Sequence, residues 1–218
     1  MKLASTTQAG RKLLLSLLLT LGSCAASAVD DYIAGTHYQI LEQPITVTNS
    51  SQIMVNEFFG YSCPHCNKFD PLLHRWTNQQ SLDVTMIAVP VVFNSRWEPY
   101  AKAYHLAHQL RVFEQAHQKM YDAIHIYQQQ MTSRQNLADF FVELGVTEAD
   151  FAAAYDSFDL KNKLRQARRL ALKAKISSVP SMLIDGKYVI TAQMAGGQAE
   201  MLAVTDFLIT RTRQQRSE

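Results

Sequence analysis

Two cysteines, Cys63 and Cys66, lie at the junction between a strand-like segment and a helix-like one, and few folds accommodate this placement. Residues 52–59 are rich in β-branched and aromatic side chains, which predicts a buried strand. From Phe69 onward, apolar residues recur at the spacing of one helix face, and Pro64 suits the first turn of that helix. This order indicates a small α/β domain whose first helix begins at Cys63.

The rest of the chain extends this α/β pattern. The further elements are a buried strand at 84–93, helices within 99–175, a β-hairpin at 182–190 and a helix at 198–213. Ser133 and Thr147 are predicted to cap helices, and Asp185-Gly186 is predicted to form the hairpin turn. The helical stretch therefore looks like an insertion into the α/β domain.

The first 28 residues are predicted to be an export signal. Basic residues precede a short apolar run at residues 13–21, and small residues follow. Cleavage before Val29, after Ala26-Ser27-Ala28, is one expectation. Leu21-Gly22-Ser23-Cys24 also resembles a lipobox, in which Cys24 would be lipidated and become the new N-terminus. Both alternatives are left open, and in either case only Cys63 and Cys66 remain for thiol chemistry.

Composition narrows the possible functions. Hydrophobic residues make up 47% of the chain, which favours a packed globular core. The 21 basic and 19 acidic residues give a net charge of +2, so no nucleic-acid partner is expected.

A metal or purely structural role for the cysteine pair is disfavoured. A structural zinc site needs about four ligands. The motif offers two cysteines and His65, whereas His105 and His108 share a face elsewhere. No metal or cofactor is therefore expected, and the histidines outside the motif are interpreted as surface or packed residues. A disulfide between Cys63 and Cys66 would close too short a loop to stabilise a fold usefully.

The motif is instead suited to thiol–disulfide exchange. Cys63 is predicted at a helix N-terminus, where unpaired N–H groups and the helix dipole favour a thiolate. His65 supplies a further cation or donor, and Cys66 lies one turn inside the helix. This spacing predicts an exposed nucleophile, Cys63, and a sheltered resolving thiol, Cys66.

Two segments, Phe58 to Cys66 and Ser178 to Tyr188, resemble the signature segments of the DsbA family of bacterial periplasmic oxidases. The resemblance covers essentially everything after Asp30. It implies a thioredoxin fold with an inserted α-helical domain. Its parts are expected at residues 29–98, 99–175 (the insertion) and 176–218. The Pro-His dipeptide between the cysteines is typical of the oxidising members.

The resemblance also implies roles for residues outside the motif. Pro180 is expected to have a cis peptide bond, and Val179 to offer its backbone to an extended client segment. Glu57, an acid within an apolar strand, is expected to relay protons to the resolving thiol, although a structural hydrogen-bonding role is the alternative. Relatives place a basic residue near this acid, but residues 84–93 contain no Lys or Arg.

The function expected from these features is donation of the Cys63–Cys66 disulfide to unfolded exported proteins with free cysteines. The resemblance implies a Gram-negative periplasmic location and reoxidation by a membrane quinone oxidoreductase of the DsbB type. The lipobox alternative adds a lipid anchor at Cys24. A monomer is expected. The alternatives are a disulfide isomerase or reductase on the same fold and a non-catalytic chaperone or binding module.

Overall fold

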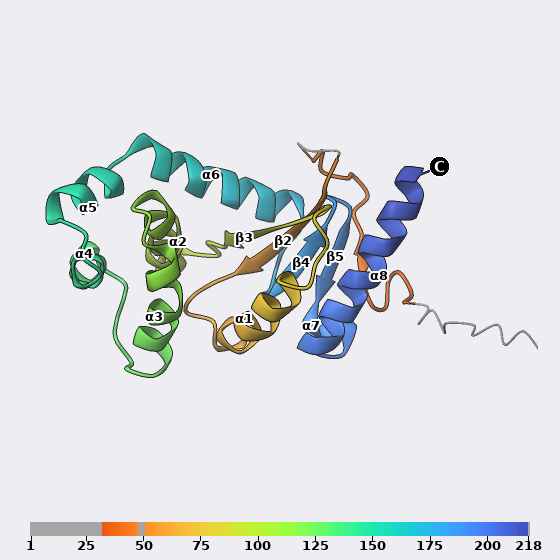
Figure 1. Cartoon of the computed structure of the whole chain (residues 1–218), viewed down its shortest axis with the longest axis horizontal. Helices are drawn as coiled ribbons and strands as arrows, with labels where there is room; N and C mark the ends of the chain where they lie inside the picture. Colours follow the sequence, from red (N-terminus) through yellow and green to blue (C-terminus); the bar gives the residue numbers. More distant parts are fainter. Residues whose placement is uncertain (1–31, 48–50, 218) are drawn as a thin grey trace, which may run out of the picture. The chain divides into compact units, whose positions relative to one another are not determined.

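The computed structural model describes residues 32–47 and 51–217. In this part of the chain, five strands form one mixed sheet in the order β1-β5-β4-β2-β3 (Figure 1). None of the described helices is both long enough and apolar enough to cross a membrane. The predicted export signal at residues 1–28, with Cys24, lies outside the described residues.

The strand β2 (Ile53–Phe59) lies inside the sheet and leads directly to the cysteines. It pairs in parallel with β3 (Val84–Pro90) and antiparallel with β4 (Ser181–Ile184). All of its residues except Met54 are buried, which accounts for its nearly continuous apolar sequence. After a turn at residues 60–63, helix α1 (Pro64–Thr77) begins. The predicted strand-to-helix junction is confirmed.

The strand predicted at residues 84–93 is shorter and less buried than expected. β3 ends at Pro90, forms one edge of the sheet and is mostly half-buried. Phe93, beyond its end, is 41% exposed. Proline has no N–H to donate to a neighbouring strand, so it suits the end of an edge strand. The apolar run in the sequence thus combines an edge strand with the loop that follows it.

The chain between β3 and β4 is helical, as predicted. Its elements are the 3-10 turn η1 (Ser95–Trp97) and helices α2 (Glu98–Gln109), α3 (Phe113–His125), α4 (Arg134–Glu143), α5 (Glu148–Tyr155) and α6 (Phe158–Lys173). Ser133 and Thr147 cap α4 and α5 through their side-chain oxygens. Tyr127 lies beyond the end of α3 and is 68% exposed.

The predicted β-hairpin joins β4 to β5 (Tyr188–Thr191). Asp185 and Gly186 both have positive φ, and the N–H of Lys187 donates to the carbonyl of Ile184 (2.9 Å). A side chain at Gly186 would collide with the carbonyl oxygen of Ile45, which packs directly against the turn. Glycine is therefore required here by both its backbone angle and its neighbour.

The remaining elements complete the two ends of the described chain. The two-residue strand β1 (Gln39–Ile40) pairs with β5 and was not predicted, because it is too short to show periodicity. Helix α7 (Ala192–Ala195) follows β5, and helix α8 (Gln198–Ser217) extends four residues beyond the expected end.

Helices pack on both faces of the sheet (Figure 1). On one face, α1 and α8 bury a core that includes Val55 and Ile184. On the other, α6 covers Phe58 and Leu183. The cysteines belong to another cluster, which joins Phe59 to the interior of helices α2–α6. They therefore lie where the helical stretch meets the sheet.

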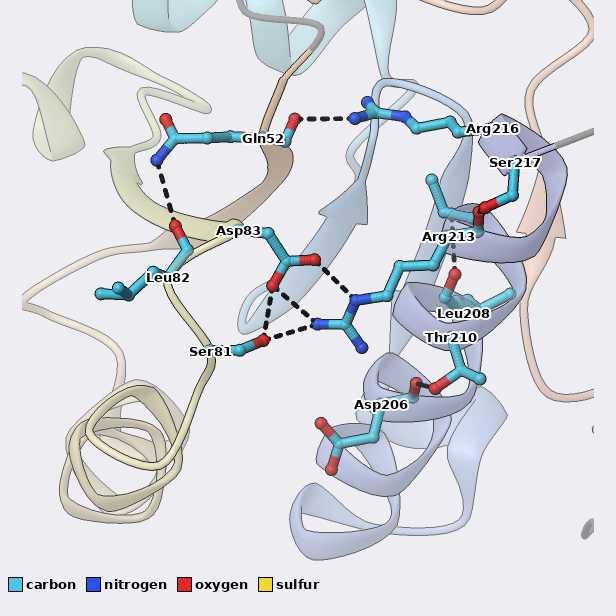
Figure 2. Close-up of polar contacts among 11 residues, drawn as sticks. Gln52, Ser81, Leu82, Asp83, Asp206, Leu208, Thr210, Arg213, Arg216 and Ser217 are labelled. Carbon is cyan, nitrogen blue, oxygen red and sulfur yellow. Dashed lines mark hydrogen bonds and ion pairs between the residues drawn. The ribbon is translucent and has the colours of Figure 1, made fainter.

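Helix α8 is tied to the start of β3 by charged groups (Figure 2). Arg213 donates from Nε and Nη2 to the two carboxylate oxygens of Asp83 (2.6 and 2.9 Å), and from Nη2 to Ser81 Oγ (2.7 Å). Arg216 donates to the carbonyl of Gln52 (3.2 Å). The hydrogen bond from Arg213, and then that from Ser81, hold the pKa of Asp83 well below its usual range.

We expect Arg213→Ala to lower the free energy of unfolding by about 0.5–1 kcal/mol at pH 7, since this pair is solvent-accessible but bidentate. The folded-state pKa of Asp83 is depressed, so its contribution is present above the unfolded pKa of about 4 and is lost as pH falls below that value. Urea unfolding of wild type and variant at pH 7 and pH 2.5 measures this. If the difference in unfolding free energy between wild type and Arg213→Ala does not shrink at pH 2.5, the prediction is contradicted. Asp83→Asn is the matched control.

Candidate functional site

Cys63 is the N-cap residue of α1. Its extended backbone (φ −89°, ψ 116°) turns the side chain back over the first helical turn, where Sγ accepts a hydrogen bond from the Cys66 N–H (3.4 Å). Its own N–H donates to the carbonyl of Gly60 (2.9 Å), which closes the turn between β2 and α1. The prediction that the nucleophile is exposed is wrong: Cys63 is 8% exposed, because its side chain turns back over the first turn of α1 and lies beside the Val179 carbonyl.

These contacts lower the pKa of the Cys63 thiol to about 6. The largest cause is the hydrogen bond from the Cys66 side chain. The backbone N–H groups of Cys66 and His65 and the charge of His65 act in the same direction, while burial opposes them. Cys63 is therefore largely a thiolate at neutral pH, which is the form that attacks and leaves disulfides.

Cys66 has the opposite character. It is completely buried, and burial raises its pKa far above the usual range of a thiol; its interactions with Cys63 add to this. It therefore stays protonated at neutral pH once it is released from a disulfide. Both cysteines are present as free thiols in the structure.

Pro64 and His65 occupy the first turn of α1 and are exposed. Pro64 is the first helical residue, where the absence of an N–H costs no hydrogen bond. The carbonyl of His65 accepts a hydrogen bond from Gln198 Nε2 (2.7 Å). This contact links the beginning of α1 to the beginning of α8.

The segment before β4 brings Val179 and Pro180 to the cysteines. The peptide bond between them is cis, as the family resemblance implied. In its protonated form, Cys63 Sγ donates to the carbonyl oxygen of Val179 (3.6 Å), which lies 116 positions later in the sequence. Pro180 is buried and Val179 is half-buried. A backbone carbonyl therefore lies directly beside the more reactive sulfur.

Glu57 lies in β2, opposite Ala88 of β3 and Met182 of β4, and is 4% exposed. Burial raises its pKa to about 8, and the negative charges of Asp70 and Cys63 contribute further. Every cause identified for this shift raises the pKa, in keeping with the lack of Lys and Arg in β3. Glu57 is accordingly protonated at neutral pH and lies within electrostatic range of the reacting sulfur.

The turn before Cys63 is closely covered by η1. The Trp97 ring packs on Gly60 so closely that a Cβ at this position would collide with it. A hollow of about 520 Å³ adjoins the turn and is lined by Ser62, Arg96, Trp97 and Tyr100, among others. Space for an extended chain is therefore available beside the motif.

Sequence reasoning missed the groups that surround Tyr61. The Tyr61 hydroxyl is hydrogen-bonded to His117 Nδ1 (2.7 Å), and His117 Nε2 donates to Asp70 Oδ1 (2.8 Å). His125 Nε2 donates to the Tyr61 carbonyl (2.7 Å). The available signal was the recurrence of His117, Tyr121 and His125 at four-residue spacing, which places them on one helix face.

The described residues contain no cluster of three or more His, Cys, Asp or Glu side chains that could hold a metal ion. His105 and His108 lie on α2, and burial lowers the pKa of both; that of His105 falls to about 4.

Comparison with known proteins identifies relatives along almost the whole chain. The model of the DSBA-like thioredoxin domain matches residues 54–206. The thiol:disulfide interchange protein DsbA of Pseudomonas aeruginosa PAO1 is 32% identical over 205 residues, which cover 93% of this chain and 97% of the relative. The protein of the same name from Azotobacter vinelandii is 32% identical over 210 residues, covering 93% and 98%.

Solved structures agree with these matches. The crystal structure of Pseudomonas aeruginosa DsbA has a TM-score of 0.83 at 31% identity and covers 87% of this chain and 99% of that chain. The oxidoreductase DsbA from Xylella fastidiosa gives 0.78 at 32% identity, covering 84% and 98%. The predicted thioredoxin fold with an inserted α-helical domain is confirmed. The chain belongs to the family of DSBA-like thioredoxin domains.

Proposed function

We propose that this protein is a thiol:disulfide oxidoreductase that donates its Cys63–Cys66 disulfide to pairs of cysteines in exported proteins. The observation that carries the proposal is the opposite protonation of the two thiols: Cys63 has a pKa of about 6, and burial raises that of Cys66. Stabilising the Cys63 thiolate stabilises the reduced protein, and this makes its disulfide a stronger oxidant. The names of the relatives support the same activity.

The reaction begins with the oxidised pair. A client thiolate attacks Cys63 Sγ, which forms a mixed disulfide and releases Cys66. Cys66 takes up a proton, for which protonated Glu57 is the proposed donor, and Glu57 later regains a proton from solvent. A second client thiolate then attacks the client sulfur of the mixed disulfide. Cys63 leaves as a thiolate, and the two electrons lost by the client dithiol now reside in the reduced cysteine pair.

Client binding uses the segment beside Cys63. The Val179 backbone is proposed to pair with an extended client segment by strand addition, with Pro180 fixing its path. Main-chain pairing is largely independent of client sequence, which suits a broad set of unfolded substrates. Pro64 and His65 are exposed at the first turn of α1 and belong to the same client-facing surface.

The proposal extends to the cellular setting. We place the protein in the periplasm of a Gram-negative bacterium, exported by residues 1–28 and either cleaved before Val29 or lipidated at Cys24. A DsbB-type membrane quinone oxidoreductase would reoxidise it, and the protein would act as a monomer. We assign residues 29–98 and 176–218 to the thioredoxin fold and 99–175 to the insertion.

The reduction potential of the Val29–Glu218 protein, equilibrated with glutathione and trapped with a thiol reagent, tests the direction of electron flow. We expect a value near about −120 mV, the potential characteristic of DsbA itself rather than one calculated from this structure. A value near about −270 mV, as in thioredoxin, would indicate a reductase. If Cys63→Ser left the function of the protein intact, the protein would be a non-catalytic chaperone or binding module instead.

The lowered pKa of Cys63 leads to a separate prediction. Alkylation of the reduced protein by iodoacetamide should accelerate with a midpoint near pH 6, because the thiolate is the reacting form. Cys66 should stay unmodified in the folded protein. Mass spectrometry of quenched samples identifies the alkylated residue. The urea-unfolded protein is the control, with a midpoint near about 8.5, and the same midpoint in the folded protein would contradict the prediction.

Glu57→Gln should stabilise the reduced protein at neutral pH. The folded-state pKa of Glu57 is about 8, so folding must protonate a group that is ionised in the unfolded chain. The variant should gain about 2–3 kcal/mol at pH 7 and nothing below about pH 4. Urea unfolding at both pH values measures the gain.

The same variant tests the proposed proton donor. Glutamine cannot supply a proton to Cys66, so Glu57→Gln should slow oxidation of a reduced peptide by roughly tenfold or more. Unchanged kinetics together with increased stability would assign Glu57 a structural role only.

A further inference from the structure

We infer that one face of α3 positions the turn that carries Cys63, and that it does so by holding Tyr61. We call His117, Tyr121 and His125, together with Asp70 of α1, the α3 clamp. The inference deepens the proposed function and rests on it, because it adds positioning residues to the same site. None of these residues belongs to the Cys-x-x-Cys motif.

Three side chains of the clamp lie four residues apart and therefore share one helix face. His117 contacts the Tyr61 hydroxyl (2.7 Å), and His125 contacts the Tyr61 carbonyl (2.7 Å). Between them, the Tyr121 ring packs edge-on against the Tyr61 ring, with 4.9 Å between centroids. Tyr61 is 1% exposed, so solvent does not compete for these contacts. Helix α3 thus contacts the ring, the hydroxyl and the backbone carbonyl of Tyr61.

The proton positions form one consistent set. The Asp70 carboxylate accepts, so His117 donates from Nε2–H (2.8 Å). With a proton on Nε2, the lone pair on His117 Nδ1 accepts the Tyr61 O–H. The Tyr61 carbonyl accepts from His125 Nε2–H. The hydroxyl and carbonyl of Tyr61 and both ring nitrogens of His117 therefore have hydrogen-bond partners, and satisfied buried hydrogen bonds favour one rigid arrangement.

This arrangement affects Cys63 because the α3 clamp connects two backbone segments, the turn that contains Tyr61 and helix α1. Tyr61 lies within the turn that is closed by the hydrogen bond from the Cys63 N–H to the Gly60 carbonyl (2.9 Å). Asp70 lies on α1, one turn after Cys66. The sulfur of Cys63 extends from the end of the turn, whereas its N–H donors, at His65 and Cys66, belong to α1. The clamp therefore fixes the sulfur relative to its donors.

Tyr61→Phe tests the clamp by removing one oxygen atom. We expect the Cys63 pKa, followed by thiolate absorbance at 240 nm in the reduced protein, to rise by half a unit or more. The equilibrium constant with glutathione should shift at least threefold toward the oxidised protein, which makes the variant a weaker oxidant. Tyr188→Phe is the matched control. It removes a hydroxyl from an equally buried tyrosine bonded to Gln215 (3.2 Å), and it should change neither quantity.

A second pair of variants separates positioning from folding. His125→Leu removes the donor to the Tyr61 carbonyl and should reproduce the effects of Tyr61→Phe. His125→Gln keeps an N–H donor and should restore values close to wild type. If both Tyr61→Phe and His125→Leu match the wild-type pKa and equilibrium constant, the inference is wrong. A thioredoxin-like potential in the wild type would overturn the proposed function instead, while the differences among variants still decide the clamp.

Discussion

The structure depends above all on the first turn of α1, whose backbone N–H groups meet the sulfur of Cys63. Helix termini leave such groups without intrahelical partners, and here a thiolate satisfies them. A thiol–disulfide enzyme needs one sulfur that is stable as an anion and one that is not. Both conditions follow from this single turn, because the same geometry places Cys66 in the dry interior behind Cys63.

The sheet and the helical stretch serve to hold that turn in place. β2 is interior and nearly fully buried, so the point at which it delivers the chain to α1 is rigid. The Val179–Pro180 segment enters from the far part of the sequence and places a carbonyl beside the sulfur. Helix α3 contacts Tyr61, in the turn before Cys63. Segments far apart in the sequence thus converge on a few residues around Cys63.

The parts of this arrangement that are local in the sequence could be predicted, whereas the contacts between distant segments could not. The strand, turn and helix around Cys63 followed from periodicity and from the position of proline, as did the caps at Ser133 and Thr147. The approach of Val179 was available only through family resemblance, because no local signal links residues 116 positions apart. The end of β3 was predicted wrongly because an edge strand and the apolar loop that follows it have similar compositions. Sequence alone assigns the histidines of α3 to the surface or to packing, because their partner, Tyr61, lies outside that helix.

The position of the buried Cys66 behind Cys63 affects how oxidants damage the protein. An electron-rich thiolate such as Cys63 is the preferred target of peroxides, which convert it to a sulfenic acid. Left alone, a sulfenic acid is oxidised further to sulfinic acid, which is irreversible in most proteins. A thiol three residues away on the same helical turn is placed to condense with the sulfenic acid, which expels water. The product is the Cys63–Cys66 disulfide, so an oxidative insult returns this protein to its oxidising form.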